Sequence, residues 1–253
     1  MNPKKMVLSA IIIARNEEPR IGKCIDALRF ADEVVVIDNS STDNTVAVAR
    51  EKGAIVTSLK TFDFAKLRNI AASHARSEWL LYIDADEIVT PELRHSIQHA
   101  IESNVSGIAG YEIYRKNYYL GKQWPKGEWM LRLFRKQLLQ GWRGKLHETA
   151  AVHGNLGKLT GYLLHDTHRT LSEMVIKTNE WSETEAALRF SIHHPRITWW
   201  RIIRVTITGF WYSFFSQEGW RAGTVGWIES IYQGFSMFIT YAKLWELQKN
   251  AAK

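Results

Sequence analysis

The first hundred residues alternate between short apolar runs and segments with helical spacing, and this alternation most strongly limits what the chain can fold into. Strands separated by helices of ten to fifteen residues, on the order of those expected here, imply right-handed βαβ units and a parallel sheet. The first half is therefore predicted to be α/β and Rossmann-like. The expected strands are 9–14, 34–37, 54–58 and 78–83, and the expected helices are 17–30, 41–53 and 64–75.

Length, charge and cysteine content narrow the class of protein. A chain of 253 residues that is 45% hydrophobic can form one large domain, or one domain with an appendage. Cys24 is the single cysteine, which excludes a disulfide framework and indicates a reducing, cytoplasmic compartment. The N-terminal residues do not have the pattern of a signal peptide. The net charge of +7 predicts an anionic partner, but the basic residues are dispersed and no nucleic-acid-binding signature is present, so nucleic acid is not expected.

Residues 79–87 read WLLYIDADE and predict a buried strand that ends in closely spaced acids. Ligands of open α/β sheets bind at the carboxyl ends of such strands, so Asp84 and Asp86 are expected to face a crevice. Carboxylates suit Mg²⁺ or Mn²⁺, which commonly bind substrate phosphates as well. The alternative is an acidic turn before a helix that begins near Pro91, because a D-x-D pattern is short and common.

The turns after the first two strands carry polar side chains instead of a glycine-rich phosphate loop. Arg15, Asn16 and Glu17 follow the first strand and can hold a base or ribose, with the arginine near phosphate. An acidic helix N-terminus explains Glu17 equally well. Asp38 ends the second strand, where it can accept ribose hydroxyls, and the next few residues can cap the second helix.

Taken together, these pieces resemble the family 2 glycosyltransferases, which have the GT-A fold. The resemblance rests on motifs in the family's order, and it continues through WMLRLFR at 129–135, LHE at 146–148, His165 and YAKLWE at 241–246, as in the branch that includes lipopolysaccharide core β-1,4-glucosyltransferases. It covers nearly the whole chain. The donor-half motifs are Arg15-Asn16-Glu17, VIDNSSTDNT at 36–45, Arg68-Asn69 and Asp84-Ala85-Asp86.

The resemblance implies a nucleotide-diphospho-sugar donor bound against the first four strands. It implies a metal ion held by Asp86 and Asp84, with His165 as a third ligand or in contact with the diphosphate. A structural role for His165 is the alternative. Residues 1–165 would form a GT-A catalytic domain, with a donor half at 1–105 and an acceptor half at 106–165, and 166–253 a helical extension. The donor-binding residues implied are Arg15, Asn16, Glu17, Asp38, Arg68 and Asp84.

An inverting transfer needs a general base that accepts the proton of the attacking hydroxyl. Glu148 occupies the place where related transferases carry an acidic pair, and it is our choice. Glu128 and Asp166 are the alternatives, and an ion pair between Glu148 and Lys145 is the structural reading. The segment Asp166-Thr167-His168 departs from the family pattern, which puts acceptor specificity in doubt.

The carboxy-terminal segment is rich in tryptophan and has helical spacing of apolar residues. Its longest charge-free stretches, 205–217 and 230–242, fall short of the roughly twenty residues that span a bilayer. We expect interfacial helices at an anionic leaflet, with core packing or a homodimer contact as the alternatives. The basic residues that flank these helices are Arg196, Arg201, Arg204, Arg221 and Lys243.

The sequence therefore predicts an inverting glycosyltransferase that is cytoplasmic and peripheral on the inner face of the cytoplasmic membrane. Its acceptor would be a lipid-linked glycan, such as lipopolysaccharide core or a similar surface polysaccharide. One rival is a haloacid dehalogenase-type phosphohydrolase, which expects threonine or valine where Ile88 stands. The other is a nucleotide-sugar-binding membrane adaptor without catalysis.

Overall fold

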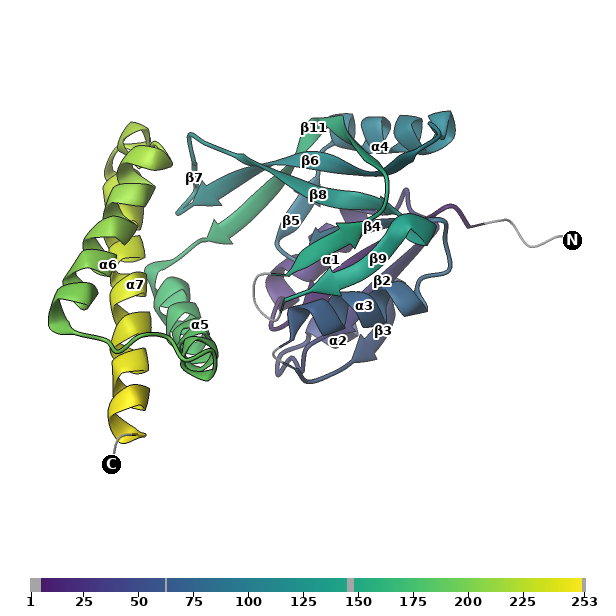
Figure 1. Ribbon diagram of the computed structural model, residues 1–253. Coiled ribbons are helices and arrows are strands. Elements are labelled where there is room, and N and C mark those ends of the chain that lie inside the picture. The colour runs from purple at the N-terminus through teal and green to yellow at the C-terminus, as the bar shows by residue number, and fades with distance from the viewer. Residues whose placement is uncertain (1–5, 62, 145–147, 252–253) are drawn as a thin grey trace, which may run out of the picture. The chain divides into compact units, whose positions relative to one another are not determined.

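A computed structural model describes residues 6–61, 63–144 and 148–251 of the chain. These residues contain a nine-stranded mixed sheet (Figure 1). The first four strands run parallel to one another, and the later strands extend the sheet in a largely antiparallel manner, beginning with the pairing of β8 against β4. The strands are β1 (Leu8–Ala14), β2 (Glu33–Asp38), β3 (Ile55–Ser58), β4 (Trp79–Asp84), β5 (Glu87–Val89), β6 (Ile108–Tyr119), β7 (Lys122–Gln123), β8 (Glu128–Arg135) and β11 (Asn155–His168). Their order is β3-β2-β1-β4-β8-β6-β11-β5, with β7 paired to β6.

Helices cover both faces of the parallel part of the sheet. Alternate strand residues point to opposite faces, so Ile12 packs toward α1 and α4, whereas Ile11 packs toward α3. A separate antiparallel pair, β9 (Leu139–Arg143) and β10 (Thr149–Val152), adds Trp142 to the core on the α3 side. The helices of this part are α1 (Glu18–Ala27), α2 (Thr45–Glu51), α3 (Phe64–His74) and α4 (Pro91–Ser103), with a short 3₁₀ turn at Lys136–Leu138.

The four predicted strands and the first and third predicted helices are confirmed, with small shifts at their ends. The predicted start of the second helix at residue 41 is wrong, because α2 begins at Thr45. The backbone N–H of Ser41 donates to Asp38 and that of Thr42 donates to Asn16, so these residues form a loop between strand ends. The N-cap residue Asn44 makes no capping hydrogen bond through its side chain, whereas Asp43 accepts the backbone N–H of Thr45.

A close approach between β11 and the start of α4 fixes the far side of the sheet. Gly161 has a φ of +80°, and a Cβ at this position would lie 2.3 Å from the backbone nitrogen of Leu93. Thr90 caps α4 and donates its hydroxyl to the carbonyl of Tyr162. These contacts set the position of the strand that carries His165.

The chain divides into two compact units, Met1–Lys116 with Glu128–His165, and Asn117–Gly127 with Asp166–Lys253. The second unit contains α5 (Leu171–Ser191), α6 (Trp199–Trp211), a π-helical turn at Tyr212–Ser216, a 3₁₀ turn at Gly219–Ala222 and α7 (Thr224–Asn250). Its helices pack through a small apolar cluster that includes Ala186, Val205 and Leu244. Within the described ranges, no helix is both long and apolar enough to cross a membrane.

Candidate active site

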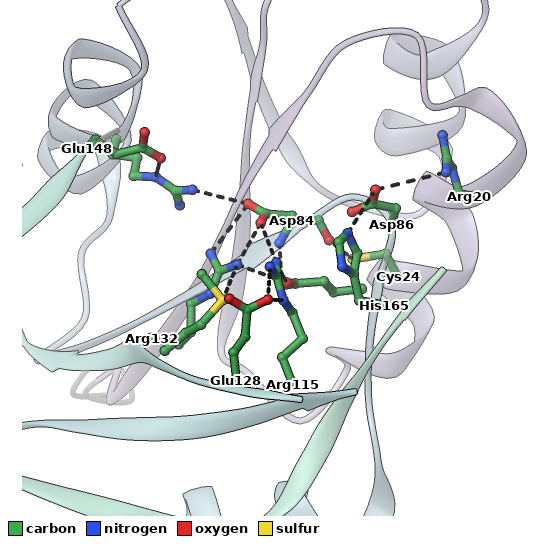
Figure 2. Close-up of polar contacts among 12 residues, drawn as sticks. Arg20, Cys24, Asp84, Asp86, Arg115, Glu128, Arg132, Glu148 and His165 are labelled. Carbon is green, nitrogen blue, oxygen red and sulfur yellow. Dashed lines mark hydrogen bonds and ion pairs between the residues drawn. The ribbon is translucent and has the colours of Figure 1, made fainter. Parts of the chain in front are cut away.

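The acidic turn lies at the carboxyl end of β4, where the chain passes into β5. Strand β5 pairs antiparallel with β11, and His165 stands opposite Glu87 in that pairing. The Oδ2 atom of Asp86 consequently lies 3.3 Å from Nε2 of His165 and 4.0 Å from Nη1 of Arg20 on α1 (Figure 2). The fold thus brings together two of the proposed metal ligands, which are far apart in the sequence.

The carboxylate of Asp84 points toward arginines (Figure 2). Its Oδ2 accepts a hydrogen bond of 2.6 Å from Nη2 of Arg132, and its Oδ1 accepts one of 3.2 Å from Nη2 of Arg68. Nη1 of Arg115 lies 3.8 Å from Oδ2. Burial by itself would raise the pKa of Asp84, but Arg132, followed by Arg68, holds that pKa well below its usual range. Asp84 is therefore an anion at neutral pH whose charge is balanced by the protein.

Glu87 joins the same cluster from a fully buried position. Its carboxylate accepts hydrogen bonds from the backbone N–H of Asp84 at 2.9 Å, from Arg132 at 2.8 Å and from Arg115 at 2.9 Å. A single buried carboxylate thus ties the turn to strands β6 and β8. The roles of Glu87, Arg115 and Arg132 were not predicted from the sequence. The available signal was Arg132 itself, a charged residue between two leucines in an apolar strand, which requires a buried partner.

Two of the three candidates for the general base belong to this cluster. Oε1 of Glu148 accepts a 2.8 Å hydrogen bond from Nε of Arg68, and Oε1 of Glu128 accepts one of 2.6 Å from Nη2 of Arg115. Arg68 thus bridges Glu148 and Asp84. Lys145, the alternative partner of Glu148, lies outside the described residues, as does the rest of the segment 145–147. Asp166 is exposed and belongs to the second unit.

Aromatic rings and an amide hold Arg68 in place. Its guanidinium carbon lies 4.8 Å from the ring centroid of Trp142 and 5.7 Å from that of Tyr82. The next residue, Asn69, accepts the backbone N–H of Trp142 and donates to its carbonyl, which fastens α3 to β9. Nη1 of Arg68 is buried and has no hydrogen-bond partner among the described residues. A buried donor of this kind is costly unless an acceptor binds to it.

The loops after β1 and β2 lock onto each other. Asn16 donates its backbone N–H to Ser41 and accepts the N–H of Thr42, while the N–H of Glu17 donates to Thr45. Asn16 and Ser40 have φ values of 55° and 59°, a conformation that is uncommon for residues other than glycine. Asp38 is buried at the end of β2, and Arg15 is exposed beside the loop. The predicted nucleoside-binding residues therefore lie on two mutually braced loops.

Asp86 and His165 are the residues best placed to hold a divalent metal. An oxygen and an imidazole nitrogen suit Mn²⁺, and a pair of protein ligands leaves positions for water and phosphate. No group of three or more His, Cys, Asp or Glu residues in the described parts of the chain is arranged to hold a metal. Cys24 lies nearby, with Sγ 3.6 Å from the carbonyl oxygen of Asp84. Burial, followed by the charge of Glu87, raises the pKa of this thiol, so it remains neutral.

A parallel sheet that ends in an acidic turn, with two polar loops beside it, gives this protein the mixed α/β, GT-A-like fold that was predicted for a glycosyltransferase. The model of the family "Glycosyl transferase family 2" matches residues 9–154, and the chain belongs to that family. The predictions of family, fold class and transferase activity are confirmed. The phosphohydrolase and non-catalytic adaptor alternatives are wrong, because the family and its relatives are glycosyltransferases.

The similarity to known proteins covers almost the whole chain. Lipopolysaccharide core biosynthesis glycosyltransferase LpsC of Rhizobium meliloti is 29% identical over 98% of this chain and 95% of its own length. An uncharacterized glycosyltransferase of Rickettsia typhi is also 29% identical, over 95% of this chain and 87% of its own. Among solved structures, S. aureus TarS is 17% identical and covers 92% of this chain and 49% of its own, with a TM-score of 0.47.

Proposed function

We propose that the enzyme transfers a sugar, with inversion, from a nucleotide-diphospho-sugar to a lipid-linked glycan during the assembly of lipopolysaccharide core or a similar surface polysaccharide. The similarity to LpsC along almost the whole chain supports this class of acceptor. We also propose that the enzyme works at the inner face of the cytoplasmic membrane, where a lipid-linked acceptor resides.

One observation carries the proposal. At the carboxyl end of β4, Asp86 faces His165 at 3.3 Å, and the buried Nη1 of Arg68 has no partner among the described residues. Asp86 and His165 would hold Mg²⁺ or Mn²⁺. Asp84, the other predicted ligand, ends β4 two residues before Asp86. The cation would stabilise the charge that develops on the diphosphate when the bond to the anomeric carbon breaks.

The remaining donor contacts come from the chain itself. Arg68 would donate from Nη1 to a diphosphate oxygen, while its other nitrogens stay bonded to Asp84 and Glu148. Asp38 would accept ribose hydroxyls at the end of β2. The braced loops would hold the nucleoside through Arg15, Asn16 and Glu17, and their existing hydrogen bonds reduce the entropy that binding would otherwise cost.

Glu148 is the base that we assign. Its carboxylate would take the proton of the acceptor hydroxyl while the hydroxyl oxygen forms a bond to the anomeric carbon, on the face opposite the departing diphosphate. The hydrogen bond from Nε of Arg68 is made to Oε1 and orients this carboxylate, so that Oε2 would take the incoming proton. The same arginine thus links the donor side of the reaction to the acceptor side.

The test compares Glu148→Gln with Glu128→Gln, since both carboxylates accept a hydrogen bond from an arginine of the same cluster. The donor is first identified by screening nucleotide sugars for a thermal shift with Mn²⁺ present. Glu148→Gln should lower the transfer rate by about 10²–10⁴ with unchanged donor affinity, and Glu128→Gln should have a much smaller effect.

The same two variants can also show that the assignment of Glu148 as the base is wrong. A large rate loss confined to Glu128→Gln would make Glu128 the base. Loss of donor affinity together with stability in Glu148→Gln would make Glu148 a scaffold residue. If no nucleotide sugar shifts the melting temperature or is consumed, the proposed donor is wrong.

A further inference from the structure

The second unit presents an apolar face along α6 and the π-helical turn that follows it. Large apolar residues recur every fourth position on this face, and all of them are exposed, with Trp199 at 76% and Ile207 at 56%. The opposite side of α6 is the one that packs, because Val205 is buried against α7. The exposed residues of this face, named the α6 face below, are Trp199, Trp200, Ile203, Ile207, Trp211, Tyr212 and Phe215.

Close helix packing leaves the α6 face outward in this unit. At Gly209 a Cβ would lie 2.8 Å from Cγ of Met237, and at Gly234 it would lie 3.0 Å from the carbonyl oxygen of Thr206. The backbones of α6 and α7 therefore meet directly on one side. An exposed, contiguous apolar face of this kind is unusual on a protein that has no partner for it.

The charges around the α6 face are mostly positive. Between residues 196 and 227 the chain has four arginines, Arg196, Arg201, Arg204 and Arg221, and a single acid, Glu218. Glu218 is paired with Arg221, so the remaining charge is positive. The guanidinium groups of Arg201 and Arg204 lie 5.9 Å and 5.6 Å from the ring centroid of Trp200, which places cations beside the aromatic residues.

An apolar face flanked by positive charge fits an anionic membrane better than a second copy of this chain. A symmetric contact between two copies would bring arginines against arginines, since the same patch faces itself across a two-fold axis. An anionic lipid leaflet supplies the opposite charge, and its headgroup region is where tryptophan and tyrosine side chains concentrate. Charge complementarity therefore favours the membrane.

We propose that the α6 face docks on an anionic bilayer, with its tryptophan and isoleucine side chains at the boundary of headgroups and acyl chains. Arg201 and Arg204 would contact the lipid phosphates. The helix would lie in the plane of the surface, as amphipathic helices with a basic flank do. This inference deepens the proposed function by assigning the membrane contact to one helix face, and its biological purpose rests on that function.

The test is co-sedimentation of the full chain with vesicles of phosphatidylcholine containing phosphatidylglycerol, compared with phosphatidylcholine alone. The variant Trp199→Ser/Ile207→Ser should bind at least tenfold more weakly than the wild type. The matched control Trp181→Ser/Ile176→Ser removes the same residue types from exposed positions on α5, and should bind like the wild type.

Replacement of the arginines and addition of salt test the electrostatic part of the proposed membrane binding. Arg201→Gln and Arg204→Gln should each weaken binding to anionic vesicles by about fivefold. Added salt should weaken it further, because screening shortens the range of the attraction. Equal binding to neutral and anionic vesicles, or equal loss in the α6 and α5 variants, would overturn the proposal. A dimer in solution that the α6 variant abolishes would replace the membrane with a second copy.

The donor-site variant Asp86→Ala separates this inference from the proposed function. It should sediment with anionic vesicles like the wild type. A failure of the transferase assignment would leave the vesicle result unchanged, and a failure of vesicle binding would leave donor binding unchanged.

Discussion

Replacement of Arg132 by methionine should lower the free energy of unfolding by about 3 kcal/mol at neutral pH. Methionine fills much of the space of the aliphatic stem but cannot balance the charges of Asp84 and Glu87. Removing one partner of a buried ion pair costs about 3–5 kcal/mol. The lower end applies here because Arg68 still lies 3.2 Å from Asp84, and Arg115 still lies 2.9 Å from Glu87.

The difference in the free energy of unfolding between Arg132→Met and the wild type should shrink as the solution becomes acidic. Burial acts to raise the pKa of Asp84, yet the arginines, Arg132 first, hold it well below the ordinary 3.8. Ionised Asp84 therefore stabilises the wild-type fold above about pH 4, and this contribution is lost as the pH falls through the folded-state pKa. Without Arg132 the folded-state pKa of Asp84 is less depressed, so the variant loses less stability in acid than the wild type does. The two free energies of unfolding should therefore approach each other as the pH falls below about 4 toward the depressed folded-state pKa of Asp84.

Urea unfolding followed by circular dichroism at several pH values measures both effects. The control is Arg29→Met, which removes an arginine from an exposed pair with Asp26 and should leave stability close to that of the wild type. If Arg132→Met were as stable as this control, or if its deficit grew in acid, the account of the cluster as a buried network of balanced charges would be wrong.

The remaining predictions concern the metal and the buried thiol. Asp86→Ala should abolish metal-dependent donor binding measured by calorimetry with Mn²⁺ while keeping the circular dichroism spectrum, and unchanged donor affinity would contradict the metal assignment. Cys24 is fully buried and its pKa is raised by burial, so iodoacetamide should modify it only in the unfolded protein. Modification of the native protein at the rate of a free thiol would show that the face of α1 that carries Cys24 does not pack on the core.

Local patterns were sufficient for the donor half of the fold. The β-branched runs of β1, β2 and β4 have few alternatives to a buried strand, and the helices between them fix the parallel arrangement. The motifs around Asn16, Asp38 and Asp84 also identified the family, because their order follows the chain. The start of α2 was predicted too early because Asp38 and Asn16 take the amides of the preceding residues, a contact made across two loops.

What the sequence determined by itself was the four strands of the donor half, the family and the acids at the end of β4. The tertiary structure alone decided what those acids touch. Arg115 and Arg132 reach the turn because β8 pairs with β4 and β6, and His165 reaches Asp86 because β11 pairs with β5. Such pairings join residues that are distant in the chain, and their register depends on packing over the whole sheet. No local pattern records that register, so the charge balance of the site becomes visible only in the folded chain.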